Sequence, residues 1–427
     1  MGNILVAIIL MMIFFVHLMI SKGNKVSTIL LFIMTIFTVI PSVVGHSFYF
    51  SYVASLILIF SIFSFSLGSM IADTLFVKQT MKNLNLSLPY IIHNKLNFLI
   101  YFGILAIFIS TLLSVSQSGY SLSEIRSFED IASIALINAS NRYNNIVEPS
   151  ILQSTLLAFT YLSALICGGQ VASVKKFNKS TTWIYYRAFL IIIFISLFGI
   201  FQNTKASSIY GFIFFFSGYI SISSLLNQID LKKYVSFFFR KRSLLIFTFF
   251  VSLMLWMQSS RYGGETSTAF ILTFFTEYAF GHVSGFYFWF DNFYNSSIEK
   301  LTLGTDSFAG ITNIFFDDIQ GSSPENIPKV IHQNYITNVD MLISELIKDF
   351  GAYFTIIIFF ISGFFVSMCD CLSKNNPIAV FPIAFISSGV SWGWVSSFYE
   401  YSIVWLCYLL FLFICISSLF FKRIQNS

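Results

Sequence analysis

The residues best suited to chemistry lie between Arg261 and Gly351, in the longest stretch of the chain that is neither continuously apolar nor a short connector. Arg261 is followed by Tyr262, Gly263 and Gly264. The planar guanidinium of an arginine matches phosphate oxygens, and adjacent glycines let backbone N–H groups approach an anion. We therefore predict that Arg261, Gly263 and Gly264 contact a phosphate or diphosphate. The alternative is an arginine that only anchors a helix end at the lipid headgroups.

Four side chains in the same stretch could accept a proton from a reacting hydroxyl. His282 and His332 are its two histidines, and imidazole titrates near neutral pH. Glu277 lies in an apolar run, where an acid is costly unless it is paired or faces water. Asp349 falls just before a further apolar run. We predict that the catalytic base is among these four, although each could equally hold the structure together.

Further side chains could bind a glycan or its diphosphate. Arg126 and Arg142 are the cations of the segment 117–150, and with Arg261 they could grip a diphosphate or an acidic sugar. The alternative is loop charge paired with neighbouring acids. Tyr278 and Tyr335 could stack against sugar faces, or could belong to an aromatic belt at the membrane surface.

The elements that must position these residues are membrane-spanning helices. Of the 427 residues, 56% are hydrophobic and 10% are charged, whereas a soluble domain carries roughly 25% charged residues. Apolar runs near the ~20 residues that cross a bilayer recur along the chain. We predict an all-α polytopic membrane protein with about eleven spans, forming a single membrane domain. The predicted spans are 4–20, 27–44, 49–71, 97–116, 151–172, 183–201, 207–226, 243–258, 351–368, 378–396 and 400–420. We expect the first to be a retained span rather than a signal peptide.

Basic residues orient these spans, because cytoplasmic loops are enriched in lysine and arginine. With the C-terminus inside and the N-terminus outside, sixteen of the 24 basic residues fall on the inner side and seven on the outer. Two long loops, 117–150 and 259–350, then lie outside. The inner loops are short and contain neither GxxxxGK[ST] nor GxGxxG. This pattern argues against a cytoplasmic nucleotide-using site or a nucleic-acid partner.

Two segments of the second long loop need separate treatment. Residues 267–290 are apolar but interrupted by polar residues and glycines, so we predict a re-entrant or interfacial hairpin rather than a twelfth span. Residues 337–350 have helical periodicity, with Thr337 as the expected cap. We expect this helix to lie on the membrane with Ser344 and Lys348 on a solvated face.

The cysteines suggest neither a disulfide nor a metal centre. The chain has five, at 167, 369, 371, 407 and 415. Cys369 and Cys371 are too close together for a structural zinc pair and have no partner pair. We therefore expect no metal and no cofactor.

The order of motifs resembles the oligosaccharide repeat-unit polymerases of bacterial surface polysaccharides, the Wzy-type O-antigen polymerases. The resemblance covers roughly residues 243–368 and rests on Ser260-Arg261-x-Gly263-Gly264, Tyr278 with Gly281-His282, Leu303-Gly304-Thr305 with Phe308, Asn334-Tyr335-Ile336-Thr337, and Asp349-Phe350-Gly351 before a span. It implies a GT-C-like fold and an active site that faces the periplasm of a bacterial inner membrane. It also implies an undecaprenyl diphosphate-linked oligosaccharide as substrate, with a flippase and a chain-length regulator as pathway partners.

The expected function is therefore glycosyl transfer that extends a lipid-linked glycan. Two alternatives stay open at this point. An O-antigen ligase would use the same donor but transfer the glycan to lipid A-core. A flippase or another transporter of lipid-linked oligosaccharides would place charges inside many spans and show internal repeats, and only Arg187 lies clearly inside a predicted span.

Overall fold

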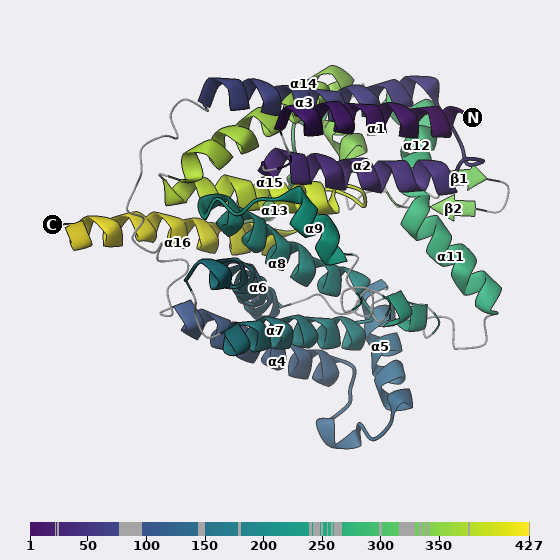
Figure 1. The fold of residues 1–427 in the computed structure, drawn as a ribbon. Coiled ribbons are helices and arrows are strands. Elements are labelled where there is room, and N and C mark those ends of the chain that lie inside the picture. The colour runs from purple at the N-terminus through teal and green to yellow at the C-terminus, as the bar shows by residue number, and fades with distance from the viewer. Residues whose placement is uncertain are drawn as a thin grey trace. The chain divides into compact units, whose positions relative to one another are not determined.

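The computed structural model describes residues 1–427 except 22, 24, 77–95, 144–149, 178–180, 239–240, 242–247, 249–250, 254, 258, 260–266, 299–300, 316–328, 333–334, 338, 340, 375 and 427. The described part is almost entirely helical (Figure 1). It divides into two compact units. Unit 1 comprises Met1–Leu84, Asn227–Tyr234 and Leu272–Trp405, and unit 2 comprises Asn85–Leu226, Val235–Ile271 and Leu406–Ser427.

Unit 1 contains the N-terminal helices and, from Leu272 on, the second long loop of the sequence analysis. Its elements are α1 (Gly2–Ser21), α2 (Val26–Val44), α3 (Tyr52–Phe76), most of α11 (Thr268–Phe280), α12 (His282–Ile298), α13 (Ala309–Phe315), β1 (Lys329–His332), β2 (Tyr335–Thr337), α14 (Leu342–Ser373) and α15 (Val380–Trp392). Unit 2 contains α4 (Asn97–Gln117), α5 (Phe128–Tyr143), α6 (Ile151–Phe177), α7 (Thr181–Phe201) and α8 (Lys205–Leu225). Helices α9 (Leu231–Phe238) and α16 (Ser402–Asn426) each contribute to both units.

Eight helices in the described part are long and apolar enough to cross a membrane: α1, α2, α3, α4, α6, α7, α8 and α14. They coincide with eight of the predicted spans. The prediction of an all-α polytopic membrane protein is therefore supported at the level of helices and their apolar character. The predicted span 243–258 falls largely outside the described residues.

The predicted span 378–396 differs from the structure, whereas 400–420 falls within α16 apart from its first two residues. Helix α15 has 13 residues, fewer than the ~20 that cross a bilayer. The backbone after Trp392 leaves the helix, and a 3₁₀ turn at Phe398–Glu400 starts at Ser397. There Ser397 and Glu400 form a capping box, in which each side chain bonds the other end of the turn. Residues 378–396 are thus not one spanning helix, and α16 begins at Ser402.

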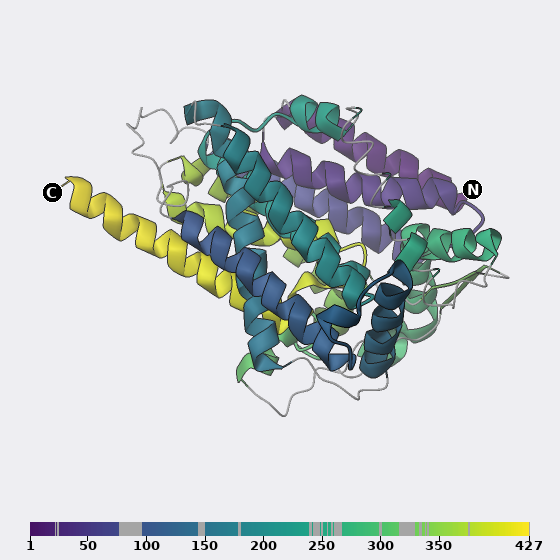
Figure 2. The same ribbon diagram turned by 90° about the horizontal axis from the view of Figure 1, so that it is seen from below.

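The framework of unit 1 is a set of helices that run side by side, among them α1, α2 and α3 (Figure 1, Figure 2). Helices α3 and α14 approach each other most closely at two glycines. A Cβ atom on Gly68 would meet the carbonyl oxygen of Phe360, and one on Gly363 would meet that of Phe65. Small residues let helix backbones come together in this way, which increases van der Waals contact between apolar helices.

Unit 2 uses the same packing between α6 and α8. A Cβ atom on Gly168 would meet the carbonyl oxygen of Phe215, and one on Gly218 would meet that of Leu165. The contact is therefore reciprocal, with a glycine from each helix facing the backbone of the other. Each unit thus contains a pair of helices that pack through glycines.

A charged cluster joins the turn between α1 and α2 to the ends of α3 and α14. Lys25 Nζ lies 3.4 Å from Asp73 Oδ1 and also donates to Cys371 Sγ at 3.6 Å. Asp370 Oδ2 accepts a hydrogen bond of 3.2 Å from the backbone N–H of Val26, the first residue of α2. The cluster thus satisfies one unpaired N–H of that helix end. In the described part of the chain, no group of three or more His, Cys, Asp or Glu side chains could hold a metal ion.

Helix α14 begins later in the chain, and its N-terminal section is more buried within the protein, than the sequence predicted. It starts at Leu342 with Met341 as the cap position, and Thr337 belongs to β2, so Thr337 does not cap it. The expected solvated face is also wrong, because Ser344 is fully buried and Lys348 is half-buried. The Ser344 hydroxyl donates to the Met341 carbonyl at 2.6 Å, and Lys348 Nζ lies 5.3 Å from the centre of the Trp289 ring. Gly351, at φ 79° and ψ 164°, breaks the helix into two sections.

A short antiparallel hairpin, β1 and β2, interrupts the otherwise helical chain. Lys329 pairs with Thr337 and Val330 with Ile336. The sequence analysis did not predict these strands, since three and four residues are too short to show an alternating pattern. The hairpin gains a further backbone bond because Tyr49 N–H donates to the Ile331 carbonyl at 2.7 Å.

Candidate functional site

The predicted diphosphate contact lies outside the described residues, since these omit Arg261, Gly263 and Gly264. Arg126 is exposed in unit 2, just before α5, and Arg142 lies within α5. Both arginines therefore belong to unit 2. The other predicted site residues all belong to unit 1.

The segment 267–290 is broken at Gly281 into α11 and α12. A Cβ atom at Gly281 would meet the Glu277 carbonyl oxygen and would lie 2.8 Å from Ile331 Cδ1 in β1. Glycine at this position thus allows the hairpin to approach the helix break. Glu277, which is 7% exposed, accepts a hydrogen bond of 3.3 Å from the backbone N–H of Ile336. The pKa of Glu277 is raised by burial, and the bond to Ile336 partly offsets this effect.

The hairpin carries two more predicted site residues, His332 and Tyr335. Their rings lie 5.8 Å apart, and the Tyr335 ring lies 5.2 Å from that of Phe48 in the loop between α2 and α3. Both side chains are half-buried. Tyr278, one turn before the helix break, is also half-buried, with its ring 5.0 Å from that of Phe274. Glu277, Tyr278, His332 and Tyr335 thus all lie on the helix break or on the hairpin packed against it.

Asp349 is fully buried and holds a turn that we call the 302–307 turn. Its Oδ1 accepts hydrogen bonds from Thr302 Oγ1 at 2.5 Å and from Asp306 N at 3.1 Å. Its Oδ2 accepts one of 2.7 Å from Ser307 N. Charge-assisted bonds of this kind are stronger than neutral ones. Because its oxygens are engaged in fixing the turn, Asp349 acts here as a structural anchor and is poorly placed to accept a proton.

The backbone of the 302–307 turn also contacts the end of the same helix section. Leu303 N–H donates to the Asp349 carbonyl at 3.1 Å. Leu303 and Gly304 have positive φ values of 50° and 98°, which glycine adopts easily and leucine rarely. A Cβ atom on Gly304 would lie 3.4 Å from the ring of Phe350. The turn is therefore fixed by its backbone and fits closely against Asp349 and Phe350.

The far side of the turn is held by Ser397. Its Oγ donates to the Ser307 carbonyl at 2.6 Å, and its N–H donates to Glu345 Oε2 at 2.7 Å. Glu345 lies four residues before Asp349, so both acids lie on one face of α14. These contacts make the 302–307 turn part of a buried polar network that also includes Ser397 and Glu345.

Sequence reasoning did not select three residues of this region, Asp306, Glu345 and Ser397. Asp306 is half-buried, and its pKa is raised first by burial and then by the nearby Asp349 carboxylate, with Lys348 acting in the opposite direction. The spacing of four between Glu345 and Asp349 was the available signal. That spacing alone does not identify the partners, because they lie 42 to 52 residues away.

His282 begins α12 and is fully buried. Its Nε2 lies 2.7 Å from the carbonyl oxygen of Phe37 in α2, which makes Nε2 the protonated nitrogen. Nδ1 is buried and has no hydrogen-bond partner in the described part of the chain. Burial lowers the pKa of His282 to about 4, although the Phe37 carbonyl acts to raise it. A neutral, enclosed imidazole of this kind is a weak candidate for the base at neutral pH.

The buried His282 predicts that stability depends on pH. Its pKa is about 4 in the folded protein against 6.5 in an exposed histidine. The unfolded chain therefore binds the proton first, so stability is constant above pH ~6.5 and falls as the pH drops toward 4, by up to about 1.4 kcal/mol per pH unit. We expect His282→Gln to have a shallower decline than the parent in unfolding measurements between pH 7.5 and 5. His46→Gln, at an exposed position, is the control, and an unchanged decline in His282→Gln would contradict the assignment.

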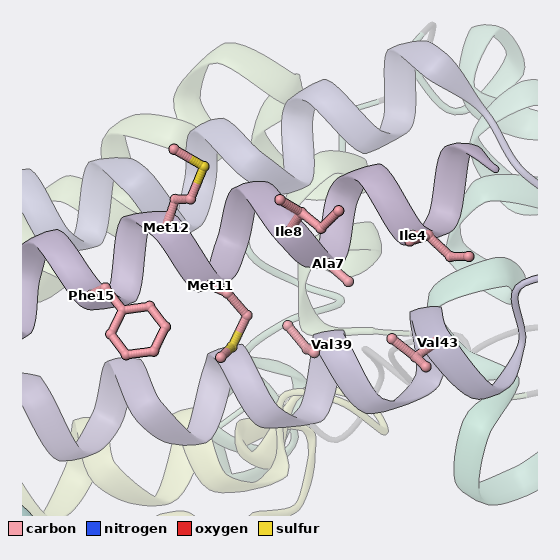
Figure 3. A pocket seen from close by; sticks show the side chains of 8 residues that line it. All are labelled: Ile4, Ala7, Ile8, Met11, Met12, Phe15, Val39 and Val43. Atoms are coloured by element: carbon pink, nitrogen blue, oxygen red, sulfur yellow. The ribbon is translucent and has the colours of Figure 1, made fainter.

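An apolar groove of about 310 Å³ lies between α1 and α2 (Figure 3). It is lined by Ile4, Ala7, Ile8, Met11, Met12, Phe15, Val39 and Val43. All eight side chains are apolar, so the groove offers van der Waals contact without hydrogen bonds. Both helices are among those that could cross a membrane. The groove therefore suits a hydrocarbon chain rather than a polar ligand.

The described site thus has two parts in unit 1. One is the helix break at Gly281 with the β1–β2 hairpin, and the other is the 302–307 turn held by Asp349. Comparison with known proteins adds no assignment: no protein-family model, no curated protein and no solved structure is similar to this chain.

Proposed function

We propose that the protein polymerises undecaprenyl diphosphate-linked oligosaccharide repeat units into a surface polysaccharide, as Wzy-type O-antigen polymerases do. One observation carries the proposal: the motifs behind the resemblance come together in pairs. Leu303-Gly304-Thr305 lies against Asp349-Phe350, and Gly281 lies against the hairpin that contains Tyr335-Ile336-Thr337. Segments that lie far apart along the chain thus contact each other, which supports a shared role for the motifs within each pair.

The proposed reaction is glycosyl transfer without a metal or another cofactor. The donor is the growing glycan on undecaprenyl diphosphate, and the acceptor is a hydroxyl at the non-reducing end of a new lipid-linked repeat unit. The acceptor oxygen bonds to the anomeric carbon while the bond to the diphosphate breaks. The diphosphate leaves with the electron pair, and cations or N–H donors stabilise its charge. Arg261 with Gly263 and Gly264 is our first choice for this role, assisted by Arg126 or Arg142.

We place the reaction at the periplasmic face of a bacterial inner membrane. The excess of basic residues in the loops assigned to the cytoplasm supports this orientation, with the N-terminus outside and the C-terminus inside. The helices long and apolar enough to cross a membrane support a multi-pass protein. A flippase that delivers the repeat units and a regulator of chain length are the partners that such a reaction requires.

The test is complementation in a strain that lacks its polymerase but makes the same repeat unit. We expect the parent gene to restore a ladder of glycan lengths on a lipopolysaccharide gel. Arg261→Ala should leave a single-repeat band at normal protein levels, while Lys233→Ala, which removes an exposed ion pair with Asp230, should keep the ladder. A normal ladder from Arg261→Ala would remove Arg261 from the mechanism.

The same gel separates the alternatives. If deletion of the native gene leaves bare lipid A-core while lipid-linked glycan still reaches the outer face of the membrane, the protein is a ligase. If lipid-linked repeats accumulate inside the cell and none reaches the outer face, it is a flippase. Either result would contradict the polymerase proposal.

A further inference from the structure

Two neighbouring carboxylates at the 302–307 turn, those of Asp349 and Asp306, differ in burial and in the hydrogen bonds that they accept. Asp349 is fully buried and accepts three hydrogen bonds, from Thr302, Asp306 and Ser307. Asp306 is half-buried, and its own carboxylate accepts no hydrogen bond within the described part of the chain. One acid is therefore engaged in holding the structure, while the other has its oxygens available.

The position of Asp306 is nevertheless fixed, because its backbone is held on both sides. Its N–H donates to Asp349 Oδ1 at 3.1 Å, and the next N–H, of Ser307, donates to Oδ2 at 2.7 Å. The Ser307 carbonyl accepts from Ser397 Oγ at 2.6 Å. A side chain on a backbone held in this way loses little freedom when it meets a substrate.

The surroundings of Asp306 suit a proton acceptor. Partial burial, and then the Asp349 carboxylate, raise the pKa of Asp306, and Lys348 acts in the opposite direction. A carboxylate with a raised pKa is the stronger base. The hydroxyl of Ser307 is buried and has no hydrogen-bond partner among the described residues, so the turn carries a second available polar atom beside Asp306.

Three of the other candidate bases, His282, Asp349 and Glu277, are less well placed. The imidazole of His282 is fully enclosed, with Nε2 on the Phe37 carbonyl. The oxygens of Asp349 are engaged by the turn. Glu277 is nearly buried and accepts from the Ile336 N–H. Asp306 combines partial exposure with a carboxylate that no described group engages.

We propose that Asp306 is the catalytic base that takes the proton of the acceptor hydroxyl, and that Asp349 is the positioning residue that holds it. This inference rests on the proposed function. As the acceptor oxygen bonds to the anomeric carbon, its proton moves to an oxygen of Asp306, and the diphosphate departs with the electron pair of the broken bond. The protonated Asp306 then returns its proton to water.

The experiment uses the full-length protein in lipid vesicles with a lipid-linked oligosaccharide, followed by glycan length and initial rate. The parent should polymerise, with a kcat that falls as the pH drops through the raised pKa of Asp306. Asp306→Asn should lower kcat by about 10²–10⁴-fold, with a smaller change in KM and no acid limb in the profile. Asp306→Glu should keep the acid limb at a reduced kcat. Asp291→Asn, at an exposed acid bound by Tyr49 and Ser51, is the matched control and should keep the parent rate.

The outcomes are distinguishable. If the parent polymerises and Asp306→Asn keeps its kcat and acid limb, the role of Asp306 is overturned and the proposed function stands. If the parent does not polymerise under conditions in which a known polymerase does, both are overturned. Asp306→Ser replaces Asp306→Asn if the latter does not fold, and a parent-like kcat in that variant overturns the assignment equally.

Discussion

Asp349→Ala is expected to destabilise the protein by roughly 3 kcal/mol or more and to abolish activity. The substitution leaves Thr302 Oγ1 and the N–H groups of Asp306 and Ser307 without their acceptor. Each buried polar group that loses its partner costs about 1–3 kcal/mol, and the three losses are coupled through one turn. Thermal unfolding of the purified protein, read beside the ladder on a lipopolysaccharide gel, measures both effects.

Two further variants test the explanation for Asp349. Asp349→Asn keeps the volume and one acceptor oxygen, so its loss should be smaller than that of alanine. Asp291→Ala removes an exposed acid that accepts from Tyr49 at 2.9 Å and from Ser51 at 2.6 Å, where water can replace it. We expect a change under about 1 kcal/mol there. Equal losses in Asp349→Ala and Asp291→Ala would show that burial of Asp349 is not the cause.

Gly363→Val is expected to separate α3 from α14 and to reduce the yield of folded protein severely. A Cβ atom at Gly363 meets the carbonyl oxygen of Phe65, which belongs to the backbone and cannot rotate away. Overpacking usually costs about 1–3 kcal/mol, and a clash with backbone falls at or above the upper end of that range. Size-exclusion profiles and melting temperatures in detergent give the measurement.

The control for Gly363→Val introduces a valine on the exposed side of the same helix. Ile361 is 56% exposed, so Ile361→Val should leave the melting temperature close to that of the parent. Gly68→Val, which meets the Phe360 carbonyl from the other helix, should reproduce the loss. Normal folding of both glycine variants would mean that the two helices can separate without cost.

Much of the helical framework could be predicted from the sequence, because a spanning helix is specified locally. An apolar run of about 20 residues is sufficient, and α1 to α4, α6 to α8 and α14 follow such runs. The elements that were missed depend on distant contacts. The β1–β2 hairpin is too short to show a period. Helix α15 ends at Trp392, and the capping box at Ser397 and Glu400 then begins a separate turn.

The site was predicted as a list of residues but not as an arrangement. Glu277, His282, His332 and Asp349 were selected by type, and the structure separates them into the helix break with its hairpin and the 302–307 turn. The start of α14 was wrong because helical periodicity in 337–341 is overridden by pairing of Thr337 with Lys329. Asp306 gave no local signal, since its environment comes from Asp349, 43 residues later.

The buried acids of unit 1 all bond to the protein backbone, and this limits which substitutions the fold excludes. Glu277, Glu345, Asp349 and Asp370 each accept a hydrogen bond from a backbone N–H. Every residue except proline supplies that group. Each of these backbone contacts therefore constrains the identity of the acid, while the contact itself requires of the donor residue only that it is not proline. Such contacts leave no covarying pair of side chains, so a fold held by them can keep its geometry while most of its loop sequence drifts.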